Sequence, residues 1–149
     1  MSIHKSKDLQ KWGVLLTTLI ASVTVIMNAS LQNVAVPQYI ETFQITTIKA
    51  QWIISLFSLS MLIALTVAPY FAKKYGYRNI FFGGIAFLTA GAFIGGFAPT
   101  FEVMLIARTF QGLGGGLITP ICLVLLREYF GIEKQGFAMG LWSFSNMLA

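Results

Sequence analysis

The chain has 149 residues, of which 56% are hydrophobic and only 10% are charged. Soluble domains carry about 25% charged residues, so this composition is typical of a protein whose solvent is largely lipid. The net charge is +5, but the cations lie between long apolar runs and do not form one basic cluster. We therefore expect an integral membrane protein with the lipid bilayer as its surroundings and with no nucleic-acid partner.

Five uncharged or nearly uncharged stretches predict membrane helices. Four of them reach the roughly 20 residues needed to cross the hydrocarbon core, and none shows the alternation of a barrel strand. The expected helices cover residues 12–36, 50–71, 79–97, 101–126 and 136–149, with an end at Pro37 and a loop over 127–134. The expected fold class is an all-α membrane protein with four full transmembrane helices and the start of a fifth.

Lysine and arginine are unevenly divided among the connecting segments. The N-terminal arm and segment 73–78 contain three cations each and segment 127–134 contains two, whereas the other two connections contain Lys49 alone. Basic segments stay in the cytoplasm. The N-terminus and both basic segments are therefore predicted to be cytoplasmic, and segments 37–49 and 98–100 are predicted to lie outside.

Glycine is concentrated in the third and fourth predicted helices. Two pairs spaced i, i+4 would let helix backbones approach closely in lipid. These pairs are Gly91 with Gly95 and Gly112 with Gly116. Three successive glycines, Gly114–Gly116, weaken a helix, so a need for thinness or bending is expected to offset that cost. Pro120 favours a bend in the same helix.

A polar stripe runs along the first predicted helix. Four side chains lie within about 80° of one another at about 100° per residue. They are Thr17, Thr24, Asn28 and Gln32. Because polar groups are costly in lipid, the stripe indicates either a water-lined cavity or hydrogen bonding to a neighbouring helix. Asn33 points the opposite way and is expected to tie this helix to another one.

Arg108 interrupts an apolar run in the fourth predicted helix. A guanidinium in that position costs about 2.5 kcal/mol or more unless it faces water or polar partners. Two interpretations are open: Arg108 snorkels to the nearby outer interface, or it lies in a transport path and bonds to polar groups of the first helix. Gln111 and Gly112 follow at i+3 and i+4 and share its face.

The residues needed for catalysis or metal binding are not grouped in this sequence. The only histidine, His4, lies in the N-terminal arm, and all five acids lie at predicted helix ends or in loops. Catalytic triads and metal sites need such groups close together, so we expect no enzyme, no metal site and no cofactor. The lone cysteine, Cys122, lies in an apolar run and is interpreted as a packing residue.

Three motifs carry a resemblance to a known family. The end of the first predicted helix, 27–37, reads M-N-A-S-L-Q-N-V-A-V-P, where the family has L-D-x-T-x-x-N-V-A-L-P. The end of that pattern matches, but Asn28 replaces the family's aspartate. The family pattern R-x-x-Q-G-x-G of the fourth helix is matched in full by Arg108, Gln111, Gly112 and Gly114.

The third motif lies between the second and third predicted helices, where the family pattern is G-x-x-x-D-R-x-G-R-R. The positions that retain a cation or the glycine are Lys73, Lys74, Gly76 and Arg78, with Lys73 replacing the family's acid. Over 11–149 the chain resembles the major facilitator superfamily, and within it the fourteen-helix drug:proton antiporters of the EmrB/QacA type.

The resemblance implies an N-terminal part of a membrane exporter of drugs or other small amphipathic compounds, driven by protons through alternating access. It implies that Arg108 acts in coupling and that the 73–78 segment acts in gating. The implied partners are a drug-like substrate, protons, the remainder of the transporter and a periplasmic adaptor protein. The implied location is the bacterial cytoplasmic membrane, which is the plasma membrane and the inner membrane of the cell.

Two alternatives belong to other classes. A truncated or split-gene polypeptide would have no transport activity of its own, and we expect that these 149 residues do not transport anything alone. A self-sufficient four-helix transporter working as a dimer would need a carboxylate in its first helix, and the first predicted helix has none.

Overall fold

The computed structural model describes the backbone of residues 2–148 and the side chains of residues 11–130 and 134–148. The side chains of Lys5 and Lys7, and all of Ala149, lie outside the described residues. The described chain consists of four helices in the order α1 (Ser2–Phe43), α2 (Thr47–Tyr75), α3 (Tyr77–Gly96) and α4 (Phe101–Leu148), and contains no strand. The expected all-α class is confirmed.

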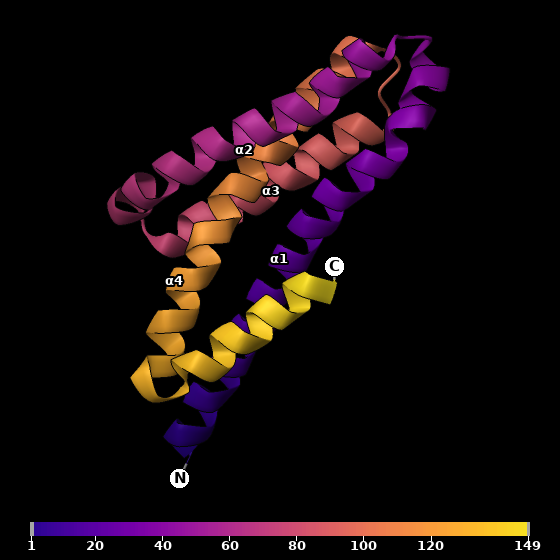
Figure 1. Cartoon of the computed structure of the whole chain (residues 1–149). Coiled ribbons are helices and arrows are strands. Elements are labelled where there is room, and N and C mark those ends of the chain that lie inside the picture. The colour runs from indigo at the N-terminus through magenta and orange to yellow at the C-terminus, as the bar shows by residue number, and fades with distance from the viewer. Residues whose placement is uncertain (1, 149) are drawn as a thin grey trace.

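Four helical segments are long and apolar enough to cross a membrane. They are Lys11–Phe43, Thr47–Tyr75, Tyr77–Gly96 and Phe101–Phe130. The assigned helix α4 runs to Leu148 through the segment expected to form a loop, but Figure 1 shows α4 turning back on itself, so its later part forms a separate helical arm. That segment, 127–134, contains no proline and includes arginine, glutamate and lysine, which favour helix. Figure 1 shows the later part of α4 folded back beside α1.

Helix α1 also extends beyond its predicted end. The sequence predicted an end at Pro37, but α1 continues through this proline to Phe43. Proline removes one backbone hydrogen bond, yet membrane helices tolerate it, because neighbouring groups can satisfy the freed carbonyl. The extension adds nearly two turns to α1 and places further side chains on its polar face.

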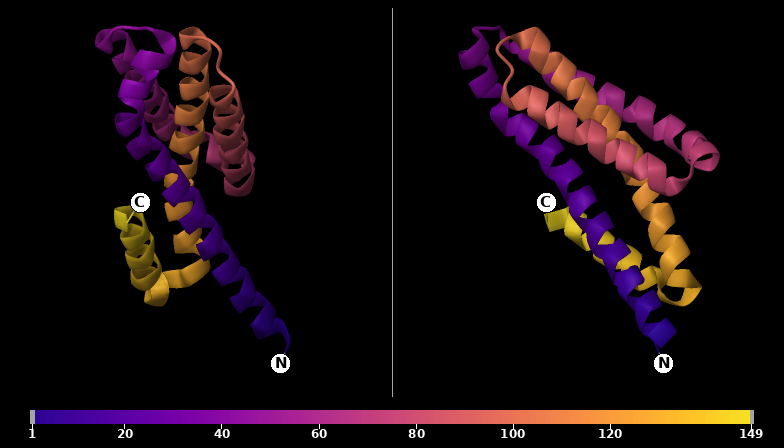
Figure 2. Two further views of the ribbon diagram at one scale, coloured as in Figure 1. Left: turned by 90° about the vertical axis from the view of Figure 1, so that its right-hand side faces the viewer. Right: turned by 180° about the vertical axis from the view of Figure 1, so that it is seen from behind.

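Helix α4 lies at the centre of the bundle. Its first part runs between α2 and α3 and also contacts α1, an arrangement visible from several sides in Figures 1 and 2. In the most apolar stretch of α4 50% of the residues are buried, against 22% to 28% in the corresponding stretches of the other three helices. The helix that carries Arg108 is therefore the one that the other three surround.

Each of the three successive glycines of α4 faces a different helix. A methyl group added to any of them would meet atoms of that neighbour too closely. The contacts of such a Cβ would include Gly84 O of α3 at 2.6 Å for Gly114, Val25 Cγ1 of α1 at 3.0 Å for Gly115, and Ala64 Cβ of α2 at 2.7 Å for Gly116. Close packing on three sides thus explains the run, for which the sequence alone left bending as an alternative.

Helices α3 and α4 also pack closely through the glycines of α3. A Cβ on Gly91 would lie 2.7 Å from Ala107 O, and one on Gly95 would lie 3.3 Å from Ala107 Cβ. Small residues at a helix interface let the backbones come together, and packing of this kind stabilises helix association in lipid. This close contact holds the part of α4 that contains Ala107 and Arg108 against α3.

The connections lie at opposite ends of the bundle. The α1–α2 and α3–α4 connections are at one end and the α2–α3 connection is at the other, as Figure 1 shows. Gly76 alone separates α2 from α3, with φ 88° and its N–H donating to Ala72 O at 2.8 Å. A side chain would strain this left-handed backbone, so glycine suits the turn.

Candidate functional site

Arg108 of α4 reaches across to α1. Its Nη1 donates to Asn28 Oδ1 at 3.3 Å and to Gln111 Oε1 at 2.8 Å, and its Nη2 donates to the Tyr39 hydroxyl. The guanidinium carbon also lies 5.6 Å from the centre of the Tyr39 ring. Arg108 therefore bonds to polar groups of α1, which is the arrangement that the second of the two interpretations requires.

Tyr39 was missed by the sequence reasoning. It follows Asn28 by eleven residues, about three helical turns, so both lie on the same face of α1 as long as the helix continues. Because the helix was expected to end at Pro37, the following residues were assigned to a loop. The available signal was the polar stripe itself, extended past the proline at the same angular spacing.

Asn28 also bonds to Gln32, its neighbour one turn further along α1. Gln32 Nε2 donates to Asn28 Oδ1 at 3.3 Å, so the same oxygen accepts from Gln32 and from Arg108. Gln32 is 1% exposed. Gln32 Oε1 and Arg108 Nε are buried and have no hydrogen-bond partner among the described residues. Buried polar atoms are nearly always paired, so these two atoms are candidates for pairing with water or a ligand.

These residues line a cavity of about 490 Å³ between α1, α3 and α4. It lies toward the end where α1 joins α2, because Thr42 and Phe43 belong to its wall. The remaining lining residues are Asn28, Leu31, Gln32, Ala35, Gln38, Tyr39, Ala92, Gly95, Gly96, Ala98, Met104, Arg108 and Gln111. Sites for drug-sized ligands have volumes of about 300–1,000 Å³, so the cavity is of suitable size.

Other residues of the sequence prediction lie elsewhere. Thr24 is exposed and donates to Ile20 O, one turn back on its own helix, and it does not line the cavity. Asn33 is exposed, so it does not bury an amide against another helix. Gly112 faces α2, where an added Cβ would meet Phe57 O. Pro120 lies within α4, partly buried.

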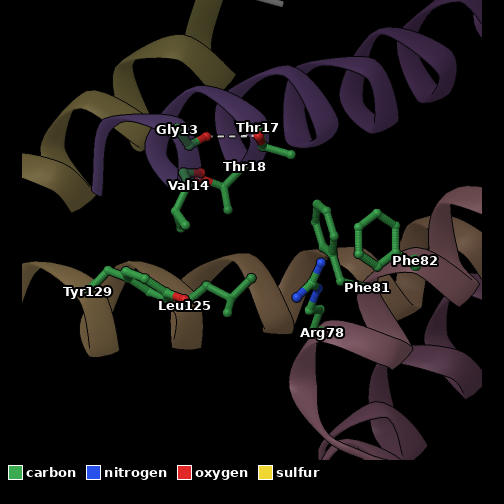
Figure 3. A pocket seen from close by; sticks show the side chains of 9 residues that line it. All are labelled: Gly13, Val14, Thr17, Thr18, Arg78, Phe81, Phe82, Leu125 and Tyr129. Atoms are coloured by element: carbon green, nitrogen blue, oxygen red, sulfur yellow. Dashed lines mark hydrogen bonds between the residues drawn. The ribbon is translucent and has the colours of Figure 1, made fainter. Parts of the chain in front are cut away.

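The residues of the α2–α3 connection that were predicted to act in gating are not near Arg108. Lys73 and Lys74 are exposed, and Lys74 Nζ lies 5.3 Å from the centre of the Tyr75 ring. Arg78 lines a different cavity, of about 380 Å³, between α1, α3 and α4. Figure 3 shows its guanidinium extending into that space beside Phe81 and Phe82. The structure therefore separates the predicted functional residues into two groups.

The cavity around Arg108 offers binding and not bond-breaking chemistry. It presents a guanidinium, four amides, a phenol and a threonine hydroxyl, with apolar side chains around them. Among the described residues, no cluster of His, Cys, Asp or Glu has the grouping that a metal ion needs. Such a set can orient a ligand by hydrogen bonds and charge.

Four helices long and apolar enough to cross a membrane, three of which line the cavity around Arg108, define a multi-pass membrane protein with a candidate solute site. The family model of the Major Facilitator Superfamily matches residues 18–149. The chain belongs to this superfamily of transporters.

Several relatives are similar over most or all of the chain. It is 29% identical to the uncharacterized MFS-type transporter YhcA of Bacillus subtilis, over 100% of the chain and 28% of YhcA. It is 33% identical to the uncharacterized transporter YcnB of the same species, over 78% of the chain and 25% of YcnB. It is 25% identical to the multidrug export protein EmrB of Haemophilus influenzae, over 99% of the chain and 30% of EmrB. The chain thus spans less than a third of the length of these relatives.

Proposed function

We propose that these helices form the N-terminal part of a membrane exporter of drugs or other small amphipathic compounds, driven by proton antiport. The observation that carries the proposal is the hydrogen bonding of Arg108 in α4 to Asn28 and Tyr39 in α1. These residues line a cavity large enough for a drug-sized ligand. The similarity to a multidrug export protein supports the choice of substrate class. The remainder of a transporter and a periplasmic adaptor protein are partners proposed on the family resemblance alone.

The bonds of Arg108 give the proposal a mechanism. They join α1 to α4, and a change in the relative position of these two helices is one way for the cavity to open alternately to the two sides of the membrane. A substrate that competes for the guanidinium loosens the link between α1 and α4. Departure of the substrate restores the link. In this way the occupancy of the cavity biases the position of α1 against α4, which is what coupling requires.

An efflux assay tests this function. The complete reading frame that contains these residues would be expressed in a bacterial strain lacking its own drug exporters, loaded with a fluorescent amphipathic dye. We expect energised cells to lose the dye faster than cells with the empty vector, and a protonophore to remove the difference. Dye loss equal to that of the empty vector, with the protein present in the membrane, would contradict the proposal.

Replacing Asn28 with aspartate is expected to change the pH dependence of export. An amide cannot take up a proton, whereas a carboxyl group can, and Asn28 Oδ1 lies 3.3 Å from Arg108 Nη1. The variant would gain a titratable group in the cavity, so the pH dependence of its export should be shifted from that of the parent protein. Dye efflux between pH 5.5 and 8 measures this, with Asn33→Asp on the exposed face as the matched control. Identical profiles for the parent and Asn28→Asp would remove Asn28 from the transport path.

We also propose a cytoplasmic N-terminus in the bacterial cytoplasmic membrane. The separation of the connections supports this orientation, because the cations of 73–78 lie at the end opposite to the α1–α2 connection. Single cysteines at Gln44 and Tyr75, in a Cys122→Ser background, would be treated in intact cells with an impermeant thiol reagent. We expect labelling at position 44 and none at position 75 until the cells are opened. The reverse pattern would reject this orientation.

A further inference from the structure

The cavity around Arg108 contains a cation with no opposing charge. All three hydrogen-bond acceptors of the guanidinium are neutral: an amide each from Asn28 and Gln111, and the Tyr39 hydroxyl. None of the residues that line the cavity is an aspartate or a glutamate. The described walls of the cavity therefore carry one net positive charge.

We propose that this cavity selects anionic amphiphiles, compounds that join one carboxylate or similar single negative charge to an apolar body. The proposal rests on the proposed function, because it names the substrate class of the same cavity. The ligand itself supplies the negative charge that the cavity lacks.

The electrostatic argument starts from the cost of an uncompensated charge in the membrane. A cation away from bulk water is unfavourable unless an opposite charge or strong acceptors face it. A carboxylate that takes the place of one neutral acceptor adds the attraction of opposite charges to a hydrogen bond that the guanidinium already donates. A cationic ligand would instead meet a like charge. The field inside the cavity thus favours anions and disfavours cations.

The donors of Arg108 are only partly used. Nε has no partner among the described residues, and Nη2 is bonded only to the phenol of Tyr39. Nε and Nη2 lie on one edge of the guanidinium, the edge that binds a carboxylate through two parallel hydrogen bonds. A ligand carboxylate that displaces the Tyr39 hydroxyl would satisfy both donors. The exchange replaces one hydrogen bond to a neutral acceptor by two to an anionic one.

The remaining walls suit the apolar body and one polar substituent. Leu31, Ala35 and Met104 line the cavity, and the rings of Tyr39 and Phe43 stack with centres 6.4 Å apart. Gln32 Oε1 is buried without a partner and can accept a hydrogen bond from a ligand N–H or O–H. An aromatic carboxylate with a hydroxyl or amino substituent combines these features.

A binding experiment on the purified chain tests the proposal without requiring transport. The chain would be placed in lipid discs of zwitterionic lipid, with empty discs as the blank. Three probes of similar size would be compared by equilibrium dialysis: 2-naphthoate, neutral 2-naphthamide, and the cation 2-naphthylmethylammonium. We expect 2-naphthoate to bind about tenfold more tightly than the amide, equivalent to about 1.4 kcal/mol, and the cation to bind more weakly than the amide.

Two variants connect this preference to the cavity. Arg108→Gln removes the charge, and Asn28→Asp supplies an internal counter-charge 3.3 Å from Arg108 in the parent. In both variants the preference for 2-naphthoate over the amide should fall to about twofold or less. Arg127→Gln, an exposed arginine of the same helix, should keep the full preference. Helical content measured by circular dichroism checks that each variant is folded. If Arg108→Gln is not folded, the binding preference of Asn28→Asp tests the proposal.

The results that overturn the proposal are distinct from those that overturn the export function. Equal binding of the carboxylate and the amide, no saturable binding of the carboxylate, or an unchanged preference in a folded Arg108→Gln or Asn28→Asp variant each overturns the anion selectivity. A chain that prefers 2-naphthoate in discs, from a reading frame that exports no dye from cells, upholds the selectivity and contradicts the export function.

Discussion

Replacing Arg108 with alanine is expected to abolish export. The change removes the hydrogen bonds that join α4 to Asn28 and Tyr39 of α1, together with the only cation of the cavity. We expect the rate of dye efflux by the complete reading frame to fall by about a hundredfold, equivalent to about 2.7 kcal/mol, which is within the roughly 1.5–3 kcal/mol that a hydrogen bond to a charged group contributes. Initial efflux rates, divided by the amount of protein in the membrane, measure the effect.

Two further variants define what Arg108 contributes. Arg108→Lys should restore little of the activity, because an ammonium lacks the planar fork that bonds to several acceptors at once. Arg127→Ala, at an exposed position of the same helix, should leave efflux unchanged. Full efflux by Arg108→Ala would leave only the interpretation that this arginine snorkels to the membrane interface.

The second large effect is expected at Gly112. An added Cβ would meet Phe57 O of the α2 backbone and lie 2.9 Å from Ser60 Cβ, so the two helices would have to separate. Because a backbone cannot move aside like a flexible side chain, we expect Gly112→Ala to destabilise the chain by about 1–3 kcal/mol. Unfolding of the purified chain by a denaturing detergent, followed by circular dichroism, measures the change.

Gly140→Ala is the matched control for this prediction. It lies in the later part of the same helix, and an added Cβ there would have nothing within 4 Å. Alanine favours helix over glycine by about 1 kcal/mol, so this variant should be as stable as the parent or more stable. Equal destabilisation by the two substitutions would show that the close contact between α2 and α4 is not what requires glycine at 112.

The membrane helices could be predicted because the thickness of the bilayer imposes a minimum apolar length. That constraint identifies a span but does not mark its ends. Pro37 stopped the predicted first helix, yet α1 continues to Phe43, since neighbouring groups in a membrane protein can compensate for the missing donor. The segment 127–134 was expected as a loop from its charges, and it is assigned as helix because those residue types also favour helix, although α4 turns back on itself along its later part.

The candidate site was predicted in part. Asn28, Gln32 and Arg108 were conspicuous because polar groups are costly in lipid, and the structure places all three at one cavity. Tyr39 was missed because its helix was expected to end at Pro37. Thr24 shares the angular position of the stripe, but its hydroxyl donates to the backbone of its own helix. Angular spacing alone cannot distinguish such a local hydrogen bond from a contact with the cavity.

The helix that each glycine faces could be identified only from the arrangement of the helices in space. Spacing in the sequence identified the pairs, but a run of three glycines presents three faces separated by about 100°. Only the central position of α4 explains why each face needs a close neighbour. The sequence could not supply that position, because it depends on contacts between helices that are far apart along the chain.

Reversible blocking of the cavity tests most directly whether it is the transport path. Gln38 lines the cavity and is exposed, whereas Gln44 is exposed beyond the end of α1 and does not line it. Single cysteines would replace each in a Cys122→Ser background of the complete reading frame, and a bulky methanethiosulfonate would be added to cells exporting dye. We predict that modification of Gln38→Cys stops efflux and that reduction restores it, while modified Gln44→Cys exports as before. Undiminished efflux by fully modified Gln38→Cys would contradict the account.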